Sequence, residues 1–305
     1  MEADFRRAAI ALSTMAVLFG GTWPAGKEAS AHVEPATAAA ARFVVAWALL
    51  WLWARLSGRR VGRPSRADAA LVVALGLTAG AGYQLFFLFG MRLAPATDGA
   101  ILVPGLIPVL TTALAWPVQG ERPGRRTAVG LAVALAGLVL VVDPVGGLGS
   151  RRLEGDAVLA GAALSWAAYS LLGREATARF DSVTANVYAT GAGALLLLPF
   201  SFLGGGWGSL ADASAGAWTG ILYLAVFGTV VSFVLFYEGV RRIGSARASS
   251  FALLVPIFGV LASVLVLGER LRPLLALGGA VVLAGLWLVQ TSRAVRPLRA
   301  AAVRD

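Results

Sequence analysis

The chain has 305 residues, of which 58% are hydrophobic and 14% charged, and its mean hydropathy is +0.77. A soluble domain carries about a quarter charged residues, so this composition excludes an ordinary soluble protein and indicates a membrane protein. The net charge of +10 does not indicate nucleic-acid binding, because the basic residues are spread over many connections instead of clustering on one face. Cysteine is absent, which excludes disulfide and thiol chemistry.

Ten apolar runs follow one another, and most are long enough for a hydrocarbon core that takes about 20 helical residues to cross. Helices are expected because lipid leaves no partner for an unpaired backbone group, and the alternation of barrel strands is missing. The sequence therefore predicts an all-α membrane protein, although the fifth run is short for a span. The predicted spans are 8–26, 36–54, 69–90, 98–118, 127–142, 157–173, 184–203, 217–238, 246–267 and 274–291.

Two blocks of sequence occur twice, in the same order. Residues 26–38 resemble residues 173–185 at an offset of 147, and a longer series of markers recurs at an offset of 148. Such collinear copies predict an internal repeat, with the first copy over 8–142, the second over 157–291 and a basic tail over 292–305. The markers of the longer block are Pro108, Gly120-Glu121-Arg122, Gly130 and Ala136-Gly137-Leu138, followed by Pro256, Gly268-Glu269-Arg270, Gly278 and Ala284-Gly285-Leu286.

The distribution of arginine predicts the orientation of the chain. Most of the 26 basic residues fall in connections on the same side as the N-terminus, which places both termini in the cytoplasm by the positive-inside rule. Five spans per copy is an odd number, so the second copy crosses the membrane in the opposite direction. Arg6-Arg7 before an apolar run resembles a signal peptide, but the segment that follows has a counterpart in the second copy, and we expect it to be retained.

Several of these features together resemble one transporter family. Pro35 followed by Arg42-Phe43, the polar start of the fourth span between Ala94 and Ala100, and the doubled Pro-to-Gly-Glu stretch are similar to the EamA-type transporters of the drug/metabolite transporter superfamily. The resemblance covers roughly 8–291, and it is the collinear order and the doubling that make it specific. It implies ten helices in two inverted repeats and a secondary carrier without ATP, metal or organic cofactor, often an exporter of amino acids or related metabolites.

Polar and aromatic residues in the middle of spans are candidates for the substrate site, because burying them in lipid is expensive. Gln84, beside Tyr83, either bonds to a neighbouring helix or faces a water-filled cavity. Trp166 and Tyr169 lie three apart on one helix face, where they pack in the core or form a wall of the pocket. Trp23 is either a third aromatic wall or an anchor at the membrane interface.

The eighth span and two prolines complete the candidate set. Thr229 and Ser232 lie three apart and are suited to a small polar ligand, but such hydroxyls commonly bond to their own helix. Pro108 and Pro256 each remove a backbone donor inside a span, and as repeat partners they are predicted to be paired hinges. The glycine-rich fifth and tenth spans are expected to pack against each other.

Charges inside the membrane are scarce, which limits both the substrate and the coupling mechanism. Asp98 is expected to cap the helix at 98–118, and no carboxylate stands alone at mid-depth, so facilitated diffusion or exchange stays open beside proton coupling. Arg42 is placed at the mouth of the second span. The pocket is therefore expected to be largely apolar with aromatic walls, without a basic residue for strongly ionic substrates.

The sequence as a whole predicts a multi-pass carrier of the cell inner membrane that exports an amino acid or a similar metabolite by alternating access. The alternatives are a transporter of another metabolite or drug, an intramembrane enzyme and a receptor. An enzyme is disfavoured because His32 is the only histidine and no Gly-x-Ser-x-Gly or His-Glu-x-x-His motif is present. The expected partners are a small-molecule substrate and the lipid bilayer, with no nucleic acid, and the oligomeric state is left open.

Overall fold

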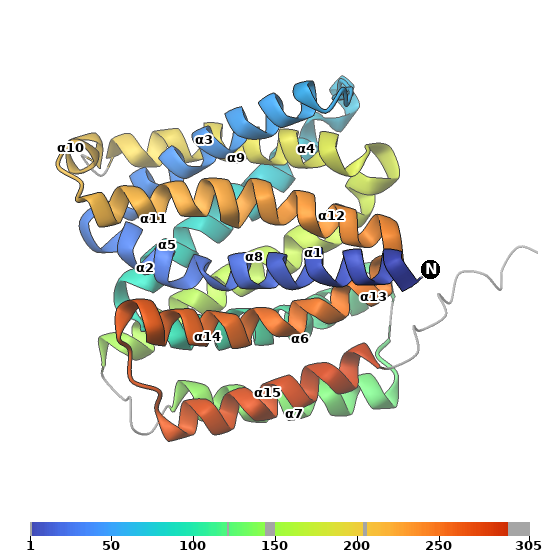
Figure 1. The fold of residues 1–305 in the computed structure, drawn as a ribbon, viewed down its shortest axis with the longest axis vertical. Coiled ribbons are helices and arrows are strands. Elements are labelled where there is room, and N and C mark those ends of the chain that lie inside the picture. The colour runs from blue at the N-terminus through green and yellow to red at the C-terminus, as the bar shows by residue number, and fades with distance from the viewer. Residues whose placement is uncertain (1, 121, 144–149, 204–205, 292–305) are drawn as a thin grey trace, which may run out of the picture.

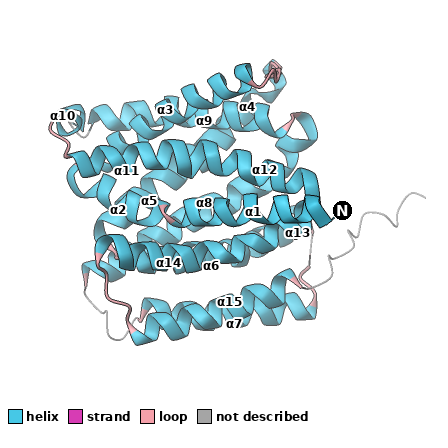
Figure 2. Ribbon diagram, viewed as in Figure 1, coloured by secondary structure: helices cyan, strands magenta, loops and turns pink. Residues whose placement is uncertain are grey.

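The computed structural model of the chain describes residues 2–120, 122–143, 150–203 and 206–291 (Figure 1). These residues form helices joined by short connections, and the described part contains no strand (Figure 2). The prediction of an all-α membrane protein is therefore confirmed. Glu121 and the predicted basic tail at 292–305 lie outside the described residues.

Many helical elements follow one another without an intervening loop, so that a single span contains up to four of them. Two elements, η2 and η3, are π-helical turns, whereas η1 and η4 are 3-10 turns. The elements are α1 (Glu2–Gly20), α2 (Thr22–His32), α3 (Pro35–Leu56), η1 (Arg66–Asp68), α4 (Ala69–Leu75), η2 (Gly76–Gly82), α5 (Tyr83–Leu93), α6 (Ala96–Gln119), α7 (Arg125–Val142), α8 (Arg151–Arg179), α9 (Ser182–Leu203), α10 (Gly206–Ala211), α11 (Ala215–Ala225), η3 (Val226–Val231), α12 (Ser232–Ile243), α13 (Ser245–Ser250), η4 (Phe251–Leu253), α14 (Leu254–Leu267) and α15 (Pro273–Gln290).

Nine helical stretches of the described residues are long and apolar enough to cross a membrane. They are Asp4–His32, Pro35–Leu56, Arg66–Leu93, Ala96–Val118, Arg125–Val142, Arg151–Gly173, Val183–Leu203, Ala215–Ile243 and Pro273–Gln290. The predicted span at 246–267 differs, because α13, η4 and α14 divide it and its apolar helical part, Phe251–Leu267, is shorter. Pro256 has no N–H to donate to the carbonyl of Ala252, which lies in the 3-10 turn η4.

The outside of the bundle is apolar, as a lipid-facing surface requires. Ile10, Leu195 and Leu265 are 62%, 70% and 81% exposed, although aliphatic side chains of this size are normally buried in water-soluble proteins. Two shallow grooves also open on this surface, one between α6 and α7 and one along α3, and both are lined mainly by apolar residues. These exposures are favourable only where hydrocarbon replaces water.

The helices form a flattened bundle in which α3 packs on α9 near one edge and α7 packs on α15 at the opposite edge (Figure 1). The α7–α15 contact depends on glycine. A Cβ on Gly137 would lie 2.7 Å from the Gly278 carbonyl oxygen, and one on Gly278 would lie 2.7 Å from the Gly137 carbonyl oxygen. Gly130 and Gly285 stand in the same reciprocal relation, at 2.8 and 2.6 Å. The prediction that these two glycine-rich spans pack together is confirmed.

Two π-helical turns occupy corresponding positions in the third and eighth predicted spans. The turn η2 lies between α4 and α5, and η3 lies between α11 and α12. Gln84 follows the first turn and Ser232 follows the second, 148 positions apart, which is the offset of the sequence repeat. A π-turn widens the helix locally and is frequent at functional sites.

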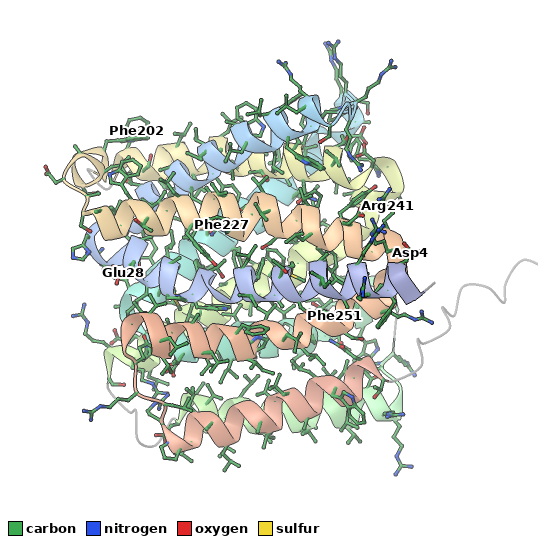
Figure 3. The ribbon with its side chains drawn as sticks, viewed as in Figure 1. Asp4, Glu28, Phe202, Phe227, Arg241 and Phe251 are labelled. Carbon is green, nitrogen blue, oxygen red and sulfur yellow. The ribbon has the colours of Figure 1, made fainter. Side chains whose placement is uncertain are left out.

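Ionic contacts join helices at both ends of the bundle. Figure 3 places Asp4 and Arg241 at one end, here called the Asp4 end, and Glu28 at the other, here called the Glu28 end. At the Asp4 end, Arg242 pairs with Asp4 at 3.0 Å and thereby joins α12 to α1. At the Glu28 end, Lys27 donates a hydrogen bond to the Ala94 carbonyl at 2.6 Å. The ion pairs among the described residues thus lie where a bilayer would meet water, whereas the polar cluster described below lies between the two ends of the bundle.

Candidate functional site

A polar cluster centred on Arg42 lies inside the bundle. Its Nη1 donates to Gln84 Oε1 at 2.5 Å, and its Nη2 donates to Thr229 Oγ1 at 3.3 Å. Arg42 is 7% exposed and Gln84 is 3% exposed. The three side chains come from α3, α5 and η3, and therefore from both predicted repeats. The cluster links the two halves of the sequence inside the bundle.

The depth of Arg42 follows from the helix geometry. It lies seven residues after Pro35, the first residue of α3, which corresponds to about 10 Å from that end of the helix. Thr229 lies fourteen residues from each end of the span Ala215–Ile243, and neighbouring Phe227 appears midway between the two ends of the bundle in Figure 3. The Arg42 guanidinium thus points into the interior of the bundle, at a depth that corresponds to the hydrocarbon core of a membrane.

The position of Arg42 corrects the expectation that the pocket contains no basic residue. The sequence interpretation placed this arginine at the mouth of its span, whereas the structure buries it beside two residues predicted for the site. The signal for a deeper position was present, because Arg42 follows a run of small alanines that lets neighbouring helices approach closely. A count of charges near helix ends does not detect this, since a long side chain extends well beyond its own Cα.

An unbroken chain of aromatic rings runs past the cluster. Trp23 packs edge-on against Phe87 at 5.5 Å, and Phe87 stacks on Tyr83 at 5.8 Å. Tyr83 lies 5.0 Å from Trp166, which lies 5.3 Å from Tyr169. Four predicted site residues are thereby brought together across α2, α5 and α8, with Phe87 as a member that the sequence analysis missed. Tyr83 directly precedes Gln84, so the aromatic chain and the polar cluster meet at the start of α5 and together make up the candidate site.

Trp23 is a buried member of the chain and not an interfacial anchor. It is 1% exposed, and within the described part of the chain no acceptor contacts its Nε1. A Cβ on Gly99 or Gly259 would lie within 3.1 Å of its ring, so both α6 and α14 approach the indole closely at a glycine. Of the two alternatives for Trp23, an aromatic residue of the interior and an anchor at the membrane interface, the structure agrees with the first.

The two hydroxyl candidates behave differently. Thr229 donates to the Leu224 carbonyl at 3.0 Å while its oxygen accepts from Arg42, so it belongs to the cluster. Ser232 donates to the Phe227 carbonyl at 2.6 Å and is 3% exposed, and none of the contacts of the described residues links it to Arg42. Both bonds span five residues, which is the spacing that the π-turn η3 creates. The prediction of bonds to the same helix thus holds for both hydroxyls.

Asp98 does not cap its helix, contrary to the prediction. Its carboxylate, which is fully buried, accepts from Arg152 Nε at 2.5 Å and from Arg272 Nη2 at 2.7 Å. The first amides of α6, those of Ala96 and Thr97, instead donate to Glu269 at 2.8 and 2.9 Å. A carboxylate from the connection before α15 therefore occupies the capping position, which frees Asp98 to join α6, α8 and that connection at the Glu28 end.

The two predicted hinges differ in their local structure. Pro108 lies within α6, which continues as a helix, and the Thr112 hydroxyl donates to the Pro108 carbonyl at 2.8 Å. Pro256 lies in the first turn of α14, directly after η4, where the regular helix begins anew. Neither proline contacts the polar cluster in any hydrogen bond found among the described residues, and their role as paired hinges stays a prediction.

These features define a multi-pass helical membrane protein with a buried polar cluster and a row of aromatic rings as its candidate site. The sequence profile of the EamA-like transporter family matches residues 6–143 and matches again over residues 153–291. The chain therefore belongs to the EamA-like transporter family. Membership makes the protein a transporter and not an enzyme.

Individual relatives point the same way. The chain is 25% identical to the uncharacterized transporter YyaM of Bacillus subtilis over 279 residues, which cover 90% of this chain and 91% of that protein. It is 28% identical over 231 residues to a protein of Streptantibioticus cattleyicolor named a probable terminal-alkyne amino-acid exporter, covering 75% of each. One crystal structure aligns with a TM-score of 0.64 at 21% identity, covering 92% of this chain and 97% of that chain, which supports the fold alone.

Proposed function

We propose that this protein is a secondary transporter of the cell inner membrane that exports a small organic metabolite, most specifically an amino acid, by alternating access. The observation that carries the proposal is the enclosed site in which Arg42, Gln84 and Thr229 adjoin a row of aromatic rings. Such a site offers polar groups to one part of a solute and apolar surface to another. The relative named as an amino-acid exporter favours this substrate class over another metabolite or drug.

We infer an architecture of ten spans in two inverted five-helix repeats, over 8–142 and 157–291. The reciprocal contacts of Gly137 with Gly278 and of Gly130 with Gly285 support it, because corresponding residues exchange contacts in this way across a two-fold axis. The matching π-turns and the double match of the family profile agree with it. With the bias of basic residues, this arrangement puts both termini in the cytoplasm.

In this proposal the aromatic chain binds the apolar part of the substrate. Tyr83, Trp166 and Tyr169 form one wall, and Trp23 Nε1, which has no acceptor among the described residues, is a donor at the far end of the row. Because the site is enclosed, the substrate enters only when the helices separate at one end of the bundle. Pro108 and Pro256 are the proposed points at which α6 and α14 bend during that movement.

Efflux from proteoliposomes tests the proposal. Vesicles that contain the purified protein and labelled phenylalanine are expected to lose the label faster than empty vesicles, while labelled glucose and uridine are retained. Tyr83→Ala is expected to slow the efflux, whereas Phe89→Ala, in the same helix but 40% exposed toward lipid, leaves it unchanged. If no amino acid in a panel of the common twenty crosses faster than in empty vesicles, the assignment of this substrate class is wrong.

A further inference from the structure

Arg42 has no acidic partner among the residues that the structure describes. Every ion pair found among the described residues involves other side chains, and the hydrogen-bond acceptors of Arg42 are the neutral Gln84 and Thr229. The Arg42 guanidinium also lies over the ring of Phe43, 5.8 Å from its centroid. Its Nε is buried and has no hydrogen-bond partner in the described part of the chain. Burying a guanidinium inside the span of a membrane helix is energetically costly, and ionisable residues found there usually have a function. The cost of burying the Arg42 charge without an acidic partner makes this residue a candidate for binding a ligand.

The free donors of Arg42 specify the chemistry of that ligand. The guanidinium has five N–H groups. Two of them bond to Gln84 and Thr229, which fixes the plane of the group. The Nε–H has no partner among the described residues, and it lies on the edge that Nε forms with a terminal nitrogen. A carboxylate accepts two parallel bonds from such an edge, and the charge of one guanidinium neutralises one carboxylate.

The neighbours of Arg42 limit the ligand to a single negative charge. Gln84, Thr229 and Tyr83 are neutral, so a phosphate dianion would leave one charge unpaired in a low-dielectric interior. The adjacent aromatic chain provides apolar surface for the remainder of the molecule. The site therefore matches an organic monocarboxylate with an apolar body.

We propose that Arg42 binds the carboxylate of the transported solute, held in place by Gln84 and Thr229, and that the protein selects monocarboxylates, amino acids among them. This inference rests on the proposed transport function and adds the group by which the substrate is recognised. The α-ammonium of an amino acid finds no carboxylate in the cluster, so its recognition contributes less than that of the carboxylate.

Matched pairs of carboxylate and amide test the inference. Thermal unfolding of the purified protein is measured with phenylalanine, N-acetylphenylalanine, phenylacetate and lactate, each beside its carboxamide. At least one acid is expected to raise the midpoint of unfolding while its amide does not. Removing one partner of a buried charge pair weakens binding about 30-fold or more, so Arg42→Gln should abolish that shift, and Arg42→Lys should restore only part of it. Arg55→Gln, an exposed arginine of the same helix, serves as the control.

The outcomes separate this inference from the transport proposal. If amides stabilise the wild-type protein as much as their acids, or if no acid stabilises it, recognition through Arg42 is wrong even where phenylalanine efflux is observed. If N-acetylphenylalanine or phenylacetate stabilises the protein while no amino acid is exported, the carboxylate inference stands and the amino-acid assignment fails. The wild-type comparison needs no variant, so poor folding of Arg42→Gln does not prevent a decision.

Discussion

The glycine contact between α7 and α15 allows a quantitative prediction. The same glycine-to-alanine substitution can be made at a glycine that packs against a neighbouring helix and at a glycine that faces open space. A Cβ on Gly137 would lie 2.7 Å from both the Gly278 oxygen and the Val282 nitrogen, and neither backbone atom can turn aside. Ordinary contact begins at 3.4 Å, so the helices must separate by about 0.7 Å. Overpacking of this kind costs about 1–3 kcal/mol.

Gly173→Ala in α8 is the matched control, since nothing lies within 4 Å of the Cβ that it would add. Both substitutions gain about 0.5–1 kcal/mol from the better helix propensity of alanine. The difference between the two variants therefore isolates the contact, and Gly137→Ala is expected to be less stable than Gly173→Ala by about 1–3 kcal/mol, or several degrees in the midpoint of thermal unfolding.

Gly278→Ala provides a second test of the same contact. Its Cβ would meet the Gly137 oxygen at 2.7 Å, so it should cost about as much as Gly137→Ala. One separation of α7 from α15 relieves both clashes, and the double variant should therefore lose less than the sum of the two. Thermal unfolding of the four proteins in detergent measures this. Equal stability of Gly137→Ala and Gly173→Ala, or strict additivity of the double variant, would refute the reciprocal glycine contact.

The other predictions concern the Glu28 end, the aromatic chain and the hinges. Asp98→Asn removes the carboxylate that two partly exposed guanidiniums share, and it should lower the free energy of unfolding by about 2 kcal/mol. Thermal unfolding measures this, and an unchanged midpoint would show that these ion pairs do not contribute to stability. Trp166→Ala removes the ring contacts with its two neighbours and should raise the KM of phenylalanine efflux about 2- to 10-fold, whereas an unchanged KM would take the indole out of the site. The Pro256→Ala and Pro108→Ala proteins should still fold but should transport phenylalanine more slowly than the wild type. Unchanged phenylalanine flux in both variants would refute the hinge hypothesis.

The helical fold was predictable because its signals are long and repeated. Apolar runs of about 20 residues mark the spans, and the offset of 148 predicts the two regions that the family profile matches separately. The packing of α7 on α15 was predictable for a similar reason, since glycine and alanine recur on both helices. Small residues have one main use inside a membrane, which is to let helices approach closely.

The electrostatics of the site were not predictable from spacing. Arg42 and Asp98 both lie near the ends of predicted spans, where interfacial and capping roles are common. Their actual partners, Thr229 and Arg272, lie 187 and 174 positions away in sequence. Only the fold brings such residues together, so the balance of charge at the site could be assessed only once Arg42 was seen beside Gln84.

Access to the Arg42 cluster from both sides of the membrane is the central claim, and the absence of cysteine makes it directly measurable. Thr229→Cys introduces a single thiol at the cluster, and Leu265→Cys places one on the lipid-facing surface as a control. Membrane-impermeant thiol reagents are added to oriented vesicles from one side or the other, with and without phenylalanine. Labelling of the Thr229→Cys protein from both sides and protection by the ligand are predicted, with no labelling of the control. A thiol at position 229 that reacts from one side only, or from neither, would contradict alternating access to this site.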